Sequence, residues 1–256
     1  MILDKAVALI TGGAQGFGKE FARCLLSNGS RVVVADMNKE LGNSFQEECS
    51  KVYGHNKMKF VYCDVTNSQE LNRTFELART EFGGLDIVCN NAGIISTKTS
   101  DVKPQIAVNL TAVIEGTYKG IELMSKSSGG NGGLVVNVAS AAGFQMMPGA
   151  PVYTSTKHAV VAFTRSFKHL PVFATDGVRV NCLCPFFCDT TMLRNAEKEN
   201  PEMKKNFEAL PKIQIKDVVK AFMQCVEDDN MNAKAVAIMP PDNVYTLVFP
   251  PAVPKL

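Results

Sequence analysis

The chain has 256 residues, 46% of them hydrophobic, which is enough to bury a substantial core in a single α/β domain spanning residues 1–256. Its 27 basic and 25 acidic residues nearly cancel and form no basic block, so they give no support for a nucleic-acid or membrane-surface role. No apolar run approaches the roughly 20 residues of a membrane span. The N-terminus lacks a secretion signal and the eight cysteines include no C-x-x-C pair. We therefore expect a cytoplasmic protein with reduced thiols and no metal site.

Short apolar runs alternate with longer amphipathic segments along the chain, a pattern typical of repeated βα units around a parallel sheet. Strands are predicted over Ala6–Ile10, Arg31–Ala35, Lys59–Cys63, Asp86–Cys89, Gly133–Val138, Arg179–Leu183 and Ala235–Met239. Helices are predicted near 17–28, 39–53, 68–82, 103–126, 153–173 and 215–228. The pattern predicts a single Rossmann-type, doubly wound parallel sheet of about seven strands with helices on both faces.

Two segments break this alternation. Residues 186–214 are rich in charge, Met and Asn, and we expect a surface excursion there that covers a ligand site. Residues 240–256 contain five prolines, so we expect an extended and irregular tail.

The first predicted strand runs directly into a glycine-rich loop, residues 11–18, and then into a helical pattern. Glycines permit a tight turn and a close approach of the backbone to a pyrophosphate at a helix N-terminus. No Gly-Lys-Ser/Thr follows, so the loop is not a Walker motif. The alternative is an ordinary surface turn. The candidate cofactor-binding residues of the loop are Gly12, Gln15, Gly16, Phe17 and Gly18.

Asp36 ends the second predicted strand, 18 positions beyond Gly18. An acid at this place can bond both ribose hydroxyls of an adenosine and repels the extra phosphate of NADP. The glycine loop contains no Lys or Arg, and Met37 follows Asp36, so the sequence favours NAD over NADP. An ordinary helix N-cap is the alternative for Asp36.

Polar residues also follow the next two predicted strands. Asp64-Val65 follows the third, and Asn90-Asn91-Ala92-Gly93 follows the fourth. The carboxyl ends of the strands form the edge at which open α/β sheets bind ligands. Helix capping by Asp64 and a simple turn at the Asn-Asn-Ala-Gly stretch are the alternatives.

Tyr153 and Lys157 are four residues apart in a predicted helix, so their side chains project from one face. A phenol normally keeps its proton up to a pKa of about 10. A fixed cation beside it favours the phenolate, and such a tyrosine can exchange a proton with an alcohol or a ketone. A chance pair on a surface helix is the alternative.

The glycine loop, Asn90–Gly93, Asn109, Ser140 and Tyr153-x-x-x-Lys157 together resemble the short-chain dehydrogenase/reductase family, over nearly the whole chain and in the family's order. The resemblance implies that Tyr153 is the acid/base, and that Lys157 lowers the pKa of Tyr153 and holds the nicotinamide ribose. It implies that Ser140 orients the substrate oxygen. It also implies that Asn109 anchors a water linking Lys157 to solvent.

The same resemblance assigns further cofactor contacts. Asp64 and Val65 would frame the adenine, Asn91 the adenosine ribose region, and Thr190 the nicotinamide carboxamide. The family's Pro-Gly after the sixth strand is Pro185-Phe186 in this chain, and a bulky aromatic there would narrow the pocket or shift the cofactor.

Longer stretches, among them Phe82–Ile87, Gly116–Tyr118 and Pro151–Tyr153, resemble the 15-hydroxyprostaglandin dehydrogenase branch of the family. This implies NAD-dependent oxidation of a hydrophobic secondary alcohol to the ketone. That branch carries a Gln, which can bond the substrate hydroxyl, where this chain has Ala150. A steroid, retinoid or small-alcohol dehydrogenase or a carbonyl reductase is therefore an alternative within the family. A non-catalytic NAD-binding protein is the alternative outside it.

The residues expected around the substrate are mostly apolar and adaptable, which suits a hydrophobic alcohol or ketone, with core packing as the alternative. They are Phe144, Gln145, Met146, Met147, Phe186, Phe187 and Met192. Residues 103–126 and 153–173 resemble the two long helices through which family members pair in a four-helix bundle. We therefore expect a homodimer or a tetramer.

Overall fold

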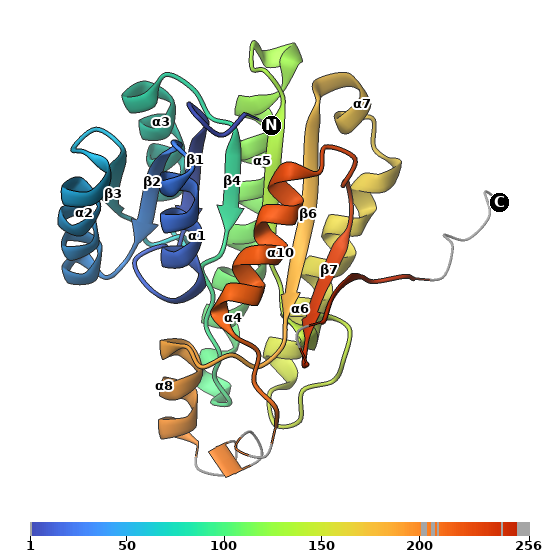
Figure 1. The fold of residues 1–256 in the computed structure, drawn as a ribbon. Helices are drawn as coiled ribbons and strands as arrows, with labels where there is room; N and C mark the ends of the chain where they lie inside the picture. The colour runs from blue at the N-terminus through green and yellow to red at the C-terminus, as the bar shows by residue number, and fades with distance from the viewer. Residues whose placement is uncertain (1, 201–203, 206–207, 209, 242, 250–256) are drawn as a thin grey trace.

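The computed structural model describes residues 2–200, 204–205, 208, 210–241 and 243–249. Its core is one sheet with the strand order β3-β2-β1-β4-β5-β6-β7-β8 (Figure 1). The strands are β1 (Val7–Thr11), β2 (Arg31–Asp36), β3 (Met58–Tyr62), β4 (Ile87–Asn90), β5 (Gly133–Val138), β6 (Val178–Pro185), β7 (Ala235–Met239) and β8 (Asn243–Thr246). Strands β1 to β7 pair in parallel, and β8 pairs antiparallel with β7. The predicted Rossmann-type sheet is confirmed, with eight strands instead of about seven.

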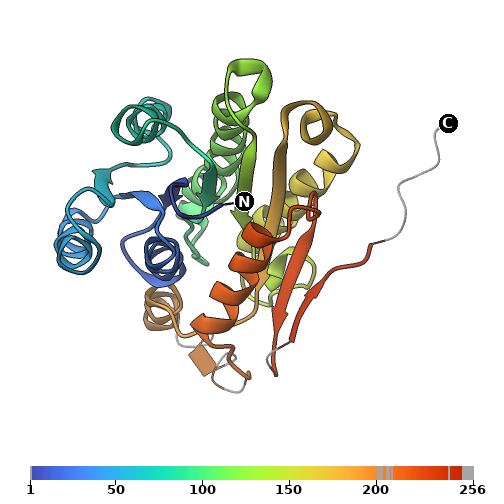
Figure 2. The same ribbon diagram turned by 45° about the horizontal axis from the view of Figure 1, so that its top comes forward.

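Helices cover both faces of the sheet, as Figures 1 and 2 show. The helices are α1 (Gly16–Ser27), α2 (Lys39–Tyr53), α3 (Ser68–Phe82), α4 (Val102–Ile106), α5 (Ala112–Met124), α6 (Pro151–Ser166), α7 (Val172–Asp176), α8 (Thr191–Glu199) and α10 (Ile215–Glu227). Strand β1 alternates its side chains between two cores: Ala8 and Ile10 join α1, α2 and α10, while Val7 and Leu9 join α3 and α5. This alternation, with both sets buried, is what a parallel sheet covered on both faces requires.

The structure differs from the predicted elements in three places. The predicted helix 103–126 is interrupted at Ala107–Thr111 by one π-helical turn, which separates α4 from α5. The predicted helix 153–173 ends at Ser166, followed by a short 3₁₀ turn and α7. The tail is not irregular throughout, because Asn243–Thr246 form β8; residues 250–256 of the predicted tail lie outside the described residues.

Strand β8 forms because its backbone pairs with the otherwise open edge of β7. Within the described part of the chain, no helix combines the length and the apolar character needed to cross a membrane.

A buried arginine ties β6 to the end of α10. Arg179 is 3% exposed. Its guanidinium donates to four backbone carbonyls and one carboxylate around the C-terminus of α10, those of Cys225, Val226, Asp228, Met231 and Asp229. A cation at this place satisfies the last carbonyls of the helix and complements its dipole.

We expect Arg179→Met to lower the free energy of unfolding by about 3 kcal/mol or more, because it leaves several buried carbonyls unpaired. Arg79→Met is the matched control: Arg79 is exposed and pairs only with Glu76, so its loss costs about 0.5 kcal/mol. Denaturant unfolding of both variants checks this. Equal losses of unfolding free energy in the two variants would contradict the role of Arg179 in tying β6 to the end of α10.

Candidate active site

The glycine loop is hydrogen-bonded to the loop that follows β4. The Thr11 hydroxyl accepts from the backbone N–H groups of Asn91, at 3.1 Å, and Ala92, at 3.2 Å. The side-chain amide of Asn91 donates to the carbonyls of Thr11 (2.9 Å) and Gly12 (2.8 Å). Asn91 thus fixes the glycine loop at the point where the strand order reverses, a role that its motif alone did not reveal.

Two glycines of the loop are required by close contacts. A Cβ atom on Gly18 would lie 2.6 Å from the Asn91 amide nitrogen, and one on Gly12, whose φ is +62°, would lie 2.8 Å from the Cα atom of Ala92. Gly16 has a φ of +56° and open space around its Cα atom. Gln15 is the N-cap of α1, and its side chain makes no capping hydrogen bond. The start of α1 therefore presents free backbone N–H groups beside an open glycine, which fits a dinucleotide pyrophosphate.

The two predicted acids lie at strand ends but do not cap helices. Asp36 accepts from the backbone N–H groups of Ala14 and Asn38, both at 3.0 Å, so its carboxylate lies against the glycine loop. Asp64 accepts from the backbone and the hydroxyl of Thr66, at 2.9 and 2.8 Å. The N-caps of α2 and α3 are Asn38 and Asn67 instead. The N-cap alternative is therefore wrong for both acids. Val65, beside Asp64, is buried in the core.

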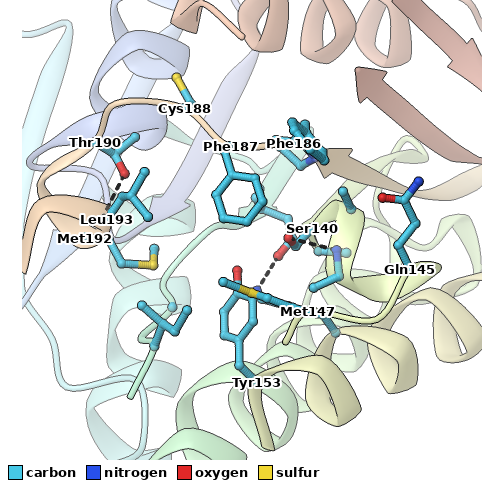
Figure 3. A pocket seen from close by; sticks show the side chains of 18 of the residues that line it. Ser140, Gln145, Met147, Tyr153, Phe186, Phe187, Cys188, Thr190, Met192 and Leu193 are labelled. Atoms are coloured by element: carbon cyan, nitrogen blue, oxygen red, sulfur yellow. Dashed lines mark hydrogen bonds between the residues drawn. The ribbon is translucent and has the colours of Figure 1, made fainter. Parts of the chain in front are cut away.

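Ser140 and Tyr153 lie close together near the carboxyl end of β5 (Figure 3), and Lys157 lines the same cavity. Ser140 follows β5 and caps a short 3₁₀ turn, accepting from the backbone N–H of Ala142 at 3.1 Å. Lys157 is 3% exposed and donates to the carbonyl of Val138 at 2.8 Å. Its Nζ atom lies 5.6 Å from the centre of the Tyr153 ring. The predicted helical pairing of Tyr153 and Lys157 in α6 is present, with Ser140 beside it.

The buried setting shifts the pKa of both titratable groups. Burial raises the pKa of the Tyr153 phenol above its usual value, while its hydrogen bond with Ser140 acts in the opposite direction. Burial lowers the pKa of Lys157 to about 8. The expected lowering of the Tyr153 pKa by Lys157 is not seen in this structure. The causes of the Tyr153 pKa shift are the desolvation of the phenol, which is the larger, and the hydrogen bond with Ser140.

Asn109 lies within the π-helical turn and is fully buried. Its side-chain amide donates to the carbonyl of Ile94 at 2.8 Å and accepts from the N–H of Ile94 at 2.8 Å. It also donates to the Thr156 hydroxyl at 3.4 Å. A Cβ atom on Gly93 would lie 3.5 Å from the Asn109 Oδ1 atom and 3.6 Å from the Lys157 Nζ atom. Asn109 therefore links the β4 loop to α6 next to Lys157.

The sequence motifs did not reveal a buried polar network that joins strands β4 and β5 to helices α5 and α6. Asn90 donates to Asn137 at 2.9 Å, Thr117 donates to the same oxygen at 3.1 Å, and Asn137 donates to Thr164 at 3.1 Å. The signal was Asn137, a lone polar residue in an otherwise apolar strand. Because all four residues are buried, the network specifies how α5 and α6 sit on β4 and β5.

A cavity of about 530 Å³ opens at the carboxyl edge of the sheet, and Tyr153, Lys157 and Ser140 form part of its wall. Its other lining residues include Phe17, Asn91, Ile95, Gln145, Met146, Met147, Phe186, Phe187, Cys188, Thr190, Met192, Leu193 and Leu210. Of the seven predicted pocket residues, Phe144 is the exception, because it packs into a separate cluster with Val160 and Val161. The cavity wall is mostly apolar, as the predicted residues suggested.

Of the segment 186–214, which the sequence predicts to cover a ligand site, Leu210 and most residues from Phe186 to Leu193, including the start of α8, line this cavity. The Thr190 hydroxyl caps α8, accepting from the N–H of Leu193 at 3.4 Å, and Thr190 also lines the cavity. Leu193 and Ala196 of α8 pack in one cluster with Ala150 and Tyr153. Ala150 is fully buried in that cluster and does not line the cavity. Ala150 is therefore part of the apolar packing that it shares with α8 and not of the cavity wall.

Comparisons with known proteins agree with this geometry. Residues 6–201 match the family model described as short chain dehydrogenase. The 15-hydroxyprostaglandin dehydrogenase (NAD(+)) of Homo sapiens is 38% identical over 250 residues, covering 93% of this chain and 92% of the relative. The 3beta-hydroxysteroid dehydrogenase 2 of Eggerthella lenta is 34% identical over 191 residues, covering 72% and 71%. The structure of levodione reductase matches with a TM-score of 0.81 at 23% identity, covering 92% of this chain and 96% of that one, which shows a shared fold.

The family model spans most of the chain, and both relatives exceed 30% identity over more than two thirds of it. The resemblance inferred from the sequence motifs, including that to the 15-hydroxyprostaglandin dehydrogenase branch, is confirmed. The chain belongs to the short chain dehydrogenase family and is an oxidoreductase.

Proposed function

We propose that the protein oxidises a hydrophobic secondary alcohol to the ketone, with NAD as the hydride acceptor and Tyr153 as the acid/base. The observation that carries this proposal is the convergence of Ser140, Tyr153 and Lys157 on the wall of a largely apolar cavity. The human relative, whose match covers 93% of this chain, is named for 15-hydroxyprostaglandin and NAD(+), and this supports the same chemistry.

Bound NAD would accept a hydride from the carbinol carbon. The Ser140 hydroxyl donates to the substrate oxygen and orients it, while the Tyr153 phenolate accepts the hydroxyl proton. The Lys157 ammonium stabilises the phenolate that this transfer needs. Asn109 holds the β4 loop beside Lys157, in the place where the family's water relay would pass to solvent. In the reverse direction Tyr153 returns the proton to the ketone.

The cofactor preference rests on Asp36. Its carboxylate lies against the glycine loop at the end of β2, where it would bond the ribose hydroxyls and repel a 2′-phosphate. Gly12, Gly16 and Gly18 would admit the pyrophosphate at α1, with Gln15 and Phe17 beside it. Asp64, Val65 and Asn91 would flank the adenosine, and Thr190 would lie at the nicotinamide end of the cavity.

We propose a cytoplasmic homodimer that pairs through α4–α5 and α6–α7. Tyr118 on α5 is 54% exposed and meets Phe163 of α6 edge-on at 5.7 Å, so these helices share an exposed aromatic surface. All eight cysteines are free thiols, which suits a reducing compartment.

A second candidate substrate class is a hydroxysteroid. The bacterial relative acts on such a compound according to its name, and a rigid fused-ring alcohol also fits an apolar cavity. It keeps the same catalytic residues and changes only the substrate.

The test is turnover of a panel of prostaglandins, hydroxysteroids and simple secondary alcohols with NAD or NADP, followed by the absorbance of the reduced cofactor. We expect NAD to be reduced, and Tyr153→Phe to lower kcat by about a thousandfold, because the general acid/base is lost while the ring packing stays. Undiminished turnover by Tyr153→Phe would exclude the mechanism. A preference for NADP would exclude the role of Asp36, and binding of NAD without any turnover would favour a non-catalytic protein.

The raised pKa of Tyr153 predicts a pH dependence. Oxidation needs the phenolate, which is the minor form at neutral pH, so we expect its kcat/KM to rise by up to about tenfold per pH unit from pH 6 to 8. Ketone reduction uses the phenol, which dominates over that range, and should stay level. Initial rates in both directions check this. An oxidation rate that does not change with pH would show that Tyr153 is not the base.

Because Lys157 is buried, we expect this proposed functional residue to lower the stability of the fold. Its folded-state pKa of about 8 lies below its ordinary 10.5, so burying the ammonium costs free energy at pH 7. We expect Lys157→Met to raise the free energy of unfolding at pH 7 by about 2 kcal/mol, a net value that includes the loss of the hydrogen bond to Val138. The variant should also be inactive. Between about pH 8 and 10.5 the unfolded wild type holds more protons than the folded, so wild-type stability rises and the advantage of the variant shrinks.

Chemical unfolding at pH 7 and 9.5 measures this difference. Lys216→Met, at an exposed position on α10, is the control and should change stability little at either pH. A Lys157→Met variant that is less stable than the wild type at pH 7 would contradict the expectation.

A further inference from the structure

The cavity wall contains one polar side chain that the proposed chemistry does not use. Asn91 is bonded to the glycine loop, Thr190 caps α8, Lys157 is bonded to Val138, and Ser140 interacts with Tyr153. Of the amide and hydroxyl side chains that line the cavity in the described part of the chain, the carboxamide of Gln145 is the one without a hydrogen-bond partner in the protein.

The position of Gln145 is fixed relative to Ser140. Its backbone N–H donates to the carbonyl of Ala141 at 2.9 Å, closing the turn that Ser140 caps. The preceding side chain, Phe144, packs away from the cavity against Val160 and Val161. A Cβ atom on Gly143 would lie 2.7 Å from the Val161 Cγ2 atom and 2.8 Å from the Lys157 carbonyl oxygen, so this turn is pressed onto α6. The turn therefore fixes the backbone of Gln145, whose side chain is exposed where it lines the cavity.

Gln145 lies apart from the side chains that would receive the reacting hydroxyl. Figure 3 shows it on one side of Ser140 and Tyr153, with Met192 and Leu193 of α8 on the other. The cavity, at about 530 Å³, would take up the nicotinamide end of the cofactor near Thr190 as well as the substrate, and Gln145 lines the same cavity. A substrate with its alcohol at Tyr153 that is longer than a short alcohol would lie along the apolar wall toward Gln145.

We propose that Gln145 determines substrate specificity by hydrogen-bonding a second, uncharged polar group of the substrate, a hydroxyl or a carbonyl. This rests on the proposed function, since it places the first hydroxyl at Ser140 and Tyr153. The carboxamide is neutral and offers both donors and an acceptor, so it matches a hydroxyl or carbonyl and supplies no charge to pair with a carboxylate. The preferred substrate is then an apolar molecule with two separated oxygen functions.

The test compares dodecan-2-ol with the dodecane-2,n-diols that carry the second hydroxyl at each position from C5 to C11. We expect the wild type to prefer at least one diol over the mono-alcohol by about tenfold in kcat/KM, the worth of one neutral hydrogen bond. Gln145→Met should abolish that preference while changing the rate with dodecan-2-ol less than about twofold, because its side chain is similar in size and apolar.

Met146→Leu is the matched control. Met146 also lines the cavity and is 88% exposed, so this variant changes the same loop without touching the carboxamide. It should keep the diol preference. Loss of the preference in both variants, equal losses on both substrate types in Gln145→Met, or a wild type without any diol preference would each overturn the role of Gln145.

Failure of the proposed function is distinguishable from failure of this inference. If no alcohol is turned over, the binding of dodecan-2-ol and of each diol to the wild type and to Gln145→Met is measured by calorimetry in the presence of NAD. Tighter binding of a diol that disappears in Gln145→Met supports the second contact even then. Equal binding of all these probes overturns it.

Discussion

The hydrogen bonds between the glycine loop and the β4 loop are the constraint on which the rest of the site depends. β1 and β4 are adjacent strands that lie far apart in the sequence, and the strand order reverses between them. Asn91 donates two hydrogen bonds to Thr11 across this point, which fixes the backbone that would receive a pyrophosphate. The same β4 loop then reaches Asn109 through Ile94, and Asn109 reaches Thr156, whose hydroxyl donates to the carbonyl of Tyr153 at 2.8 Å.

A continuous set of hydrogen bonds thus runs from the glycine loop to α6, the helix that carries the proposed acid/base Tyr153. Each bond lies in a buried or half-buried setting, where an unpaired polar group costs more than it does in water. The network of Asn90, Asn137, Thr117 and Thr164 fixes α5 and α6 on the sheet in the same way. The relative positions of the glycine loop and of the proposed catalytic side chains therefore follow from the polar interior of the fold.

Tyr153 and Lys157, the proposed catalytic pair, show the opposing demands of stability and chemistry. Burying Tyr153 and Lys157 would exclude water from the proposed proton transfer and strengthen electrostatic interactions between them. The same burial raises the pKa of the phenol and lowers that of the ammonium, so the fold disfavours the charged forms that oxidation uses. Ser140 counteracts part of this by its hydrogen bond to Tyr153. Leu193 and Ala196 of helix α8 belong to the same apolar cluster as Ala150 and Tyr153.

The sequence by itself determined the parallel sheet, the glycine loop and the Tyr153–Lys157 pair. Each of these depends on residues near one another in the chain: alternating apolar runs, glycines before a helix, and a four-residue spacing on one helix face. It did not predict β8, because that strand exists only through pairing with the open edge of β7. It also missed the holding role of Asn91, the burial of Ala150 under α8 and the direction of the Tyr153 pKa shift. Only the tertiary structure decided these, because burial and hydrogen bonding between residues up to 80 positions apart are set by how the elements pack.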